Sequence, residues 1–121
     1  MLHFYKSFGT KSLYKKWVLY DGLNSKKSIM NKISIHFYDN GTVEITDTVN
    51  RCLTTFTIHD NMIIIRPGIW TQLEGMWSDK YLQKESYVAD AFIHHLIQNP
   101  FTFKLNNHLT IYYQENMYRF K

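Results

Sequence analysis

Apolar and polar residues alternate along much of this chain, and the clearest example is the stretch ISIHFYDNGTVEITD at residues 33–47. The alternation breaks at Asp39-Asn40-Gly41 and then resumes. Successive side chains of a β-strand point to opposite faces, so this pattern predicts a hairpin with one buried and one solvated face. A fold that contains this hairpin must supply an apolar layer for its buried face.

The length of the loop decides the register of this hairpin. A two-residue Asn-Gly loop would pair Phe37 with Glu44 and place a carboxylate on the apolar face. A three-residue loop at 39–41 pairs Phe37 with Val43 instead. Because a slip of one residue would turn every side chain to the other face, the pattern selects the three-residue loop. We expect Gly41 to adopt the left-handed conformation, which costs glycine little.

Further strands are predicted on both sides of this hairpin. The segment KKWVLY is expected to form a first strand with Trp17 and Leu19 on one face, and a polar loop at 21–31 follows it. A second hairpin turns at 60–61, where Asp and Asn tolerate the positive φ that a two-residue turn demands. The stretch IWTQLEGMW at 69–77 predicts a short strand with a less regular pattern.

The end of the chain predicts a meander of three strands. A loop of three residues pairs Phe103 with Ile111, and a turn at 115–116 pairs Tyr113 with Tyr118. These registers place the apolar side chains on one face of the meander.

The spacing of the apolar residues changes once, at 83–98. There the alternation stops, and Val88, Phe92 and Leu96 recur every four residues. This spacing is typical of an amphipathic helix. Pro100 explains its end, because the residue before a proline avoids helical angles. We expect the apolar stripe of this helix to pack against the strands and help to close the core.

Together these elements predict a mainly β fold: a small antiparallel β-barrel, closed or incomplete, of about 7–8 strands with one inserted α-helix near 83–98. Successive hairpins favour antiparallel pairing, and closure of the sheet removes its exposed edges. A chain of 121 residues suits a single domain, 1–121, in which 1–12 form an N-terminal arm.

The net charge of +4 is distributed unevenly. Before Ile33, Asp21 is the one acidic residue, and the lysines there are Lys6, Lys11, Lys15, Lys16, Lys26, Lys27 and Lys32. Such a patch can attract nucleic acid or lipid headgroups, but no arginine-rich or nucleic-acid-binding motif accompanies it. We therefore favour a solvated surface over nucleic-acid binding.

The start of the chain bears on localisation. No stretch approaches the roughly 20 apolar residues of a membrane-spanning helix, and the N-terminus lacks the continuous apolar segment of a signal peptide. We expect a cytoplasmic protein if Met1 is the native start, and an envelope or periplasmic protein if a signal segment was removed.

The residues that could carry chemistry do not combine into a known catalytic or metal-binding pattern. Cys52 is the sole cysteine; Arg51 could lower its pKa, but a small buried hydrophobe is the favoured interpretation. His94 and His95 are adjacent, so they diverge by about 100° on a helix and cannot bind one metal ion as an i, i+4 pair can.

We therefore predict no catalytic residues, no metal site and no cofactor. Trp70, Trp77 and Arg51 are weak candidates for ligand or partner binding, because aromatic residues and arginine are enriched at interaction hot spots. The favoured interpretation is that both tryptophans fill the core and the barrel rim.

Several short motifs follow one another in a characteristic order. They are Trp17-x-Leu19, Phe37-x-x-x-Gly41-x-Val43, Asn50-Arg51, Thr71, a helix with Glu85, Phe92 and Leu96, the Phe-x-Phe of 101–103, Asn-x-x-Leu109-x-Ile111 and the terminal aromatic Phe120. In order and spacing they resemble the META domain, the HslJ-like family of bacterial heat-inducible proteins. The resemblance covers about 13–121 and implies a barrel-like, non-catalytic accessory or interaction domain associated with stress and antibiotic tolerance. It also implies an unknown protein partner or a membrane-associated component.

The chain departs from the family pattern at two cysteines. The family typically has Gly-Cys-Asn where this chain has Thr-Val-Asn at 48–50, and a second cysteine near Gly75 is also missing. The alternative is a lipocalin-like barrel that carries a small apolar ligand, since these barrels also open with a Trp strand and contain Phe-x-x-x-Gly hairpins. Large residues at the predicted inward positions favour a filled interior over a carrier.

Overall fold

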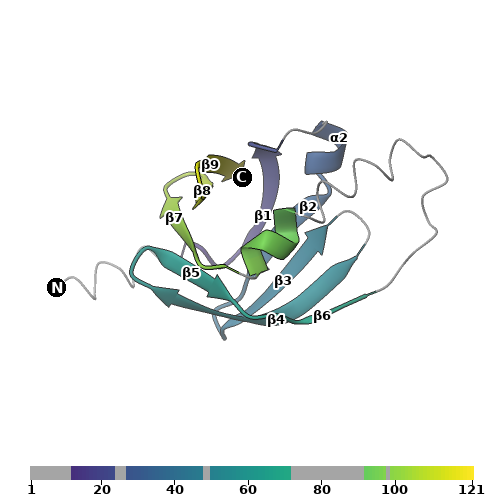
Figure 1. The fold of residues 1–121 in the computed structure, drawn as a ribbon, viewed down its shortest axis with the longest axis vertical. Helices are drawn as coiled ribbons and strands as arrows, with labels where there is room; N and C mark the ends of the chain where they lie inside the picture. Colours follow the sequence, from purple (N-terminus) through teal and green to yellow (C-terminus); the bar gives the residue numbers. More distant parts are fainter. Residues whose placement is uncertain (1–11, 24–26, 48–49, 72–91, 98) are drawn as a thin grey trace.

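The computed structural model describes residues 12–23, 27–47, 50–71, 92–97 and 99–121. These residues form a nine-stranded antiparallel sheet that curls into a barrel (Figure 1). Its elements are β1 (Lys16–Asp21), α2 (Lys27–Met30), β2 (Ile33–Phe37), β3 (Thr42–Asp47), β4 (Arg51–His59), β5 (Met62–Ile65), β6 (Ile69–Trp70), β7 (Phe101–Leu105), β8 (Leu109–Tyr113) and β9 (Asn116–Phe120). A helix at 92–97 precedes β7.

Eight of the strands form a closed ring. Strands β1 to β5 pair in chain order, β5 pairs with β7, and β7, β8 and β9 again pair in order. The ring closes where β9 pairs with β1. The short β6 lies outside this ring and pairs with β4 beside β5. The predicted small antiparallel β-barrel is thus confirmed, and it is closed.

The first hairpin has the predicted three-residue loop. Phe37 pairs with Val43, and the register continues to the far end of β2 and β3. Gly41 adopts a φ of 88°, and the Oδ1 atom of Asn40 accepts a hydrogen bond from the Thr42 backbone N–H at 3.0 Å. The first strand also has its predicted faces, because Trp17 and Leu19 are both buried.

The second hairpin and the first loop of the meander are also as predicted. Asp60 takes the positive φ of the two-residue turn, 58°, and Phe56 pairs with Ile65. Phe103 pairs with Ile111. Of the strand predicted at 69–77, β6 forms at its start, and residues 72–77 lie outside the described part of the chain.

The predicted register of the last hairpin was wrong by two residues. Tyr113 pairs with Asn116, and Tyr118 pairs with Ile111. The turn lies at 114–115, where Gln114 takes the left-handed conformation with a φ of 55°. The turn was predicted at 115–116 because Asn116 tolerates the left-handed conformation better than Gln114 does. A shift of two residues preserves the strand faces, so the inward side chains remain those that were predicted.

The polar loop predicted at 21–31 was also wrong in part. Its end forms the short helix α2, in which Ile29 and Met30 are buried against the barrel core. These two adjacent apolar residues cannot both reach the core from an extended segment, where neighbouring side chains point in opposite directions. One helical turn lets both of them pack inward.

The barrel core is continuous with the helix at 92–97. Phe92, Ile93, Leu96 and Ile97 are buried and belong to the same apolar cluster as the inward side chains of the strands. The Phe92 ring lies 4.3 Å from the Tyr118 ring, measured between centroids. Figure 1 shows this helix within the ring of strands. The predicted packing is confirmed for 92–97, whereas Val88 and the start of the predicted helix lie outside the described residues.

Large side chains fill the ring from several strands. Trp17, Phe37, Phe101 and Phe120 are among the largest fully buried side chains. The indole N–H of Trp17 donates a buried hydrogen bond of 2.9 Å to the Leu13 carbonyl, which satisfies the one polar group of this residue in the core. The segment before β1 therefore packs on the core as well.

We predict that Phe92→Ala lowers the free energy of unfolding by roughly 3–5 kcal/mol, because truncation of a buried aromatic residue leaves a cavity. His95→Ala on the exposed face of the same helix is the control, with an expected change within about 0.5 kcal/mol. The denaturant midpoints of both variants, compared with wild type without any ligand, provide the measurement. A loss below about 1 kcal/mol for Phe92→Ala would show that the helix is a loosely packed lid.

Candidate functional site

The sequence-predicted binding residues Trp70 and Arg51 do not share a surface. In the antiparallel pair of β4 and β6, Trp70 lies opposite the buried Cys52 and so faces inward. Arg51 precedes Cys52 on β4 and is exposed on the outer face. Trp77 lies outside the described residues. The structure therefore does not bring these candidates together as one site.

Trp70 packs at the rim of the barrel. It is half-buried against the core, and its ring lies 5.4 Å from the His94 ring of the helix. Arg51 uses its backbone to anchor the strand edge: its N–H donates to the Thr71 hydroxyl, and its carbonyl accepts from the Thr71 N–H, both at 2.9 Å. Trp70 thus contributes to rim packing, and Arg51 presents its guanidinium to solvent.

Cys52 is a buried thiol rather than an activated one. Burial raises the pKa of the Cys52 thiol above its ordinary value of 9.0, and the charge of Asp47 raises it further. Arg51 does not offset this effect because its side chain lies on the opposite face of β4. The thiolate is the nucleophilic form of cysteine, so this environment makes Cys52 a poor nucleophile.

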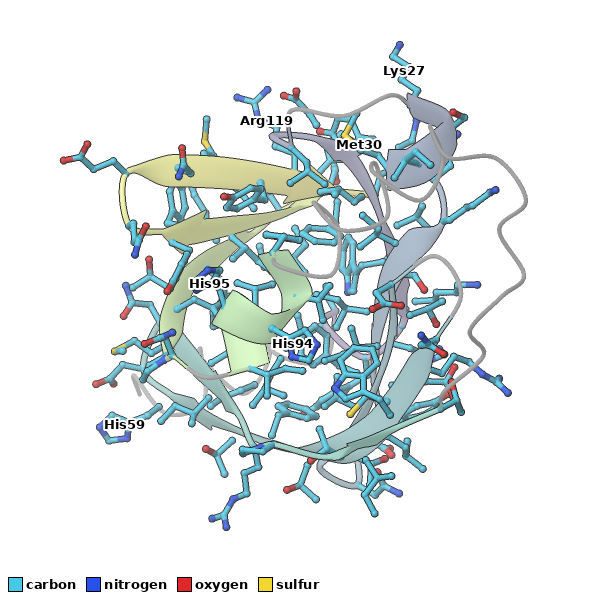
Figure 2. The ribbon with its side chains drawn as sticks, turned by 45° about the vertical axis from the view of Figure 1, so that its right-hand side comes forward. Lys27, Met30, His59, His94, His95 and Arg119 are labelled. Carbon is cyan, nitrogen blue, oxygen red and sulfur yellow. The ribbon has the colours of Figure 1, made fainter. Side chains whose placement is uncertain are left out.

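The histidines are dispersed over the barrel. His94 and His95 extend from the helix, whereas His59 projects outward at the end of β4 (Figure 2). His36 stacks on Tyr38 with 4.1 Å between ring centroids. Within the ranges that the structure describes, no three His, Cys, Asp or Glu side chains gather closely enough to hold a metal ion. In the same ranges, no helix is long and apolar enough to span a membrane.

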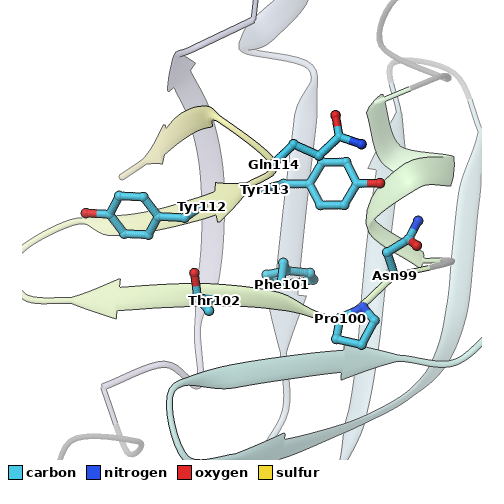
Figure 3. A pocket seen from close by; sticks show the side chains of 7 residues that line it. All are labelled: Asn99, Pro100, Phe101, Thr102, Tyr112, Tyr113 and Gln114. Carbon is cyan, nitrogen blue, oxygen red and sulfur yellow. The ribbon is translucent and has the colours of Figure 1, made fainter.

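A groove opens where the pairing of β7 with β8 ends. Thr102 and Tyr112 form the last pair of this ladder. Beyond it this ladder does not continue. On the other edges of the two strands, Phe101 pairs with Ile63 of β5 and Tyr113 pairs with Asn116 of β9. The groove has a volume of about 410 Å³, and its lining residues are Asn99, Pro100, Phe101, Thr102, Tyr112, Tyr113 and Gln114 (Figure 3).

Uncharged side chains surround this groove. The Asn99 amide N–H donates to the His95 carbonyl at 3.0 Å, which ties the groove wall to the end of the helix. The Tyr113 ring lies 6.1 Å from the His95 ring, between centroids. Gln114 lies in the turn and adopts a left-handed backbone conformation. The groove thus combines aromatic surface with neutral hydrogen-bonding groups.

The groove was not predicted from the sequence. Its walls come from two segments, 99–102 and 112–114, which the pairing of β7 with β8 brings side by side. The one local signal was the pair of tyrosines before a turn. The misplaced turn concealed it, because the turn was predicted at 115–116 and lies at 114–115.

No protein-family model and no curated protein matches this chain. Its fold is similar to two solution structures determined by NMR. One is 13% identical, with a TM-score of 0.65, over 90% of this chain and 89% of that chain. The other, from Burkholderia xenovorans, is 12% identical, with a TM-score of 0.65, over 94% of this chain and 86% of that chain. At these identities the likeness establishes the fold alone.

We predict that the protein loses stability as the pH rises above about 9, the ordinary pKa of the thiol. A group whose pKa is raised by folding contributes its full stabilisation below the pKa of the unfolded state and loses it as the pH rises through the folded pKa. Urea midpoints between neutral and alkaline pH provide the measurement. Cys52→Ala should flatten the first part of the decline.

Tyr118→Phe is the matched control for this measurement. Burial also raises the pKa of Tyr118 above 10.0, with a further increase from Tyr113 and an opposing hydrogen bond from Asn116. Its contribution is therefore lost at higher pH than that of Cys52, and Tyr118→Phe should flatten only this later part. If Cys52→Ala leaves the whole profile unchanged, the proposed environment of the thiol is wrong.

Proposed function

We propose that the protein is a non-catalytic interaction domain of the META or HslJ-like type, a stress-associated accessory module that binds its partner on the outside of the barrel. The ordered motifs from Trp17 to Phe120 support the family resemblance. The function would then lie in recognition, and the barrel would serve as a rigid support for the binding surface.

The filled interior is the observation that carries this proposal. An eight-stranded barrel is just wide enough either to be filled by side chains or to hold one small ligand. In this barrel, Trp17, Phe37, Phe101 and Phe120 occupy the interior, and the helix at 92–97 adds four buried side chains to the same cluster. This packing favours an external binding surface over an internal one.

The chemistry of the thiol supports a non-catalytic role. Cys52 is the strongest nucleophile that the chain could offer, but it is buried with a raised pKa. Its proton is therefore held more tightly than in water, and a substrate would have to displace core packing to reach it.

An exposed apolar pair supports contact with another macromolecule. Leu53 and Ile69 face each other across β4 and β6 on the outer face, with exposed fractions of 62% and 89%. Covering such side chains on binding is favourable because it removes apolar surface from water.

The alternative function is a carrier of a small apolar ligand, which the closed eight-stranded barrel itself favours. A titration of the wild-type protein with the lipophilic dye Nile red distinguishes the two. Our proposal predicts no saturable rise in dye fluorescence at micromolar protein, because the described side chains pack the inside of the ring. A lipocalin-like barrel known to bind an apolar ligand, titrated in parallel, is the positive control. Saturable binding to wild type that a fatty acid displaces would instead establish the carrier.

A further inference from the structure

The groove between β7 and β8 presents three neutral polar groups toward the same space. Figure 3 shows the Tyr113 side chain extending between the amide of Gln114 and the amide of Asn99. All three line the groove. Asn99 already uses one N–H on the His95 carbonyl, which fixes its orientation and leaves its oxygen and second N–H for a ligand.

These groups offer both donors and acceptors. A carboxamide carries two N–H donors and one carbonyl acceptor, and a tyrosine hydroxyl both donates and accepts. Sugar hydroxyls also donate and accept, so they match this set. No charged side chain is among the seven lining residues. Phosphates and carboxylates are usually bound by Arg, Lys or helix N-termini, and the groove lining supplies none of these.

Aromatic and apolar surface completes the groove. Tyr112 is 38% exposed at its edge, and Pro100 and Phe101 line it from the β7 side. A pyranose ring has an apolar C–H face that stacks on such surface and a polar edge that hydrogen-bonds. We propose that this groove binds a neutral saccharide, with the ring against Tyr113 and the hydroxyls on Asn99 and Gln114. This inference rests on the proposed function, because it assigns a ligand class to the external surface of a non-catalytic domain.

The size of the groove limits the ligand. A volume of about 410 Å³ lies at the small end of the roughly 300–1,000 Å³ usual for small-molecule sites. We therefore expect one or two sugar residues to be held. Because the groove is open to solvent, a dissociation constant on the order of 1 mM is expected for a free disaccharide.

Gln114 provides a test that separates binding from stability. Its φ of 55° lies in the left-handed region, which glycine occupies at no steric cost. Gln114→Gly removes the carboxamide and relaxes the turn, so it should weaken sugar binding without lowering the melting temperature. Asp60 has nearly the same φ, 58°, in the turn between β4 and β5. Asp60→Gly is therefore a matched control that should leave sugar binding unchanged.

The experiment is a titration of the full chain, followed by two-dimensional ¹H–¹⁵N NMR. The probes are maltose, cellobiose and chitobiose, with glucose 6-phosphate and tetra-alanine as charged and peptide comparisons. We expect at least one neutral disaccharide to shift the signals of 99–102 and 112–114 in a saturable manner. Gln114→Gly should raise its dissociation constant about 2- to 10-fold, the effect of losing one neutral hydrogen bond. Tyr113→Phe, which keeps the ring and its packing, should have a similar effect.

The outcomes separate this inference from the proposed function. If no neutral sugar shifts these signals at tens of millimolar, or if only the peptide or the phosphate does, the saccharide assignment is wrong. A filled barrel that excludes Nile red would still support the interaction role in that case. If the sugar binds and is converted to a new product in the tube, the groove assignment holds and the non-catalytic role fails.

Discussion

The pairing of β1 with β9 is the contact on which the rest of the structure depends. It joins strands from opposite ends of the chain, with Leu19 opposite Phe120 and reciprocal backbone hydrogen bonds of 2.9 Å between Val18 and Lys121. Gly22 permits this approach, because its φ is 113° and a Cβ there would collide with the backbone of β9. Bringing distant segments together costs loop-closure entropy, and burial of a common core offsets that cost. Closure also removes the two sheet edges that would otherwise pair with other chains.

Closure dictates where a function can lie. Once the ring is complete, every inward side chain contributes to one interior, and here large aromatic residues and the helix at 92–97 occupy it. Recognition is therefore expected at positions where the ring departs from regular pairing. The groove marks such a position, since the ladder between β7 and β8 ends there at Thr102 and Tyr112. The exposed pair of Leu53 and Ile69 marks another, because β6 lies outside the ring. The external features of the barrel thus lie where a ladder ends or where β6 adds to the ring.

The sequence predicted those parts of the fold that local chemistry determines. The loops at 39–41 and 60–61 were placed correctly because glycine, Asn and Asp reveal where the backbone turns left-handed. The turn at 114–115 was misplaced because Gln carries no such signal. The helix α2 was missed because its four residues are too few to show a helical period. The groove could not be predicted, since it depends on where the ladder between β7 and β8 ends and on how the end of the helix packs there.

The helix at 92–97 is a fixed part of the barrel core in the ligand-free protein. The most direct measurement is a nuclear Overhauser experiment between the aromatic rings of Phe92 and Tyr118, whose centroids lie 4.3 Å apart. If the helix is fixed in the core, we expect strong cross-peaks between these rings. We also expect the helix amides to be protected against hydrogen exchange as well as those of the barrel strands. Absent cross-peaks and helix amides that exchange as in an unfolded chain would contradict this position of the helix. The interior would then be open to a ligand.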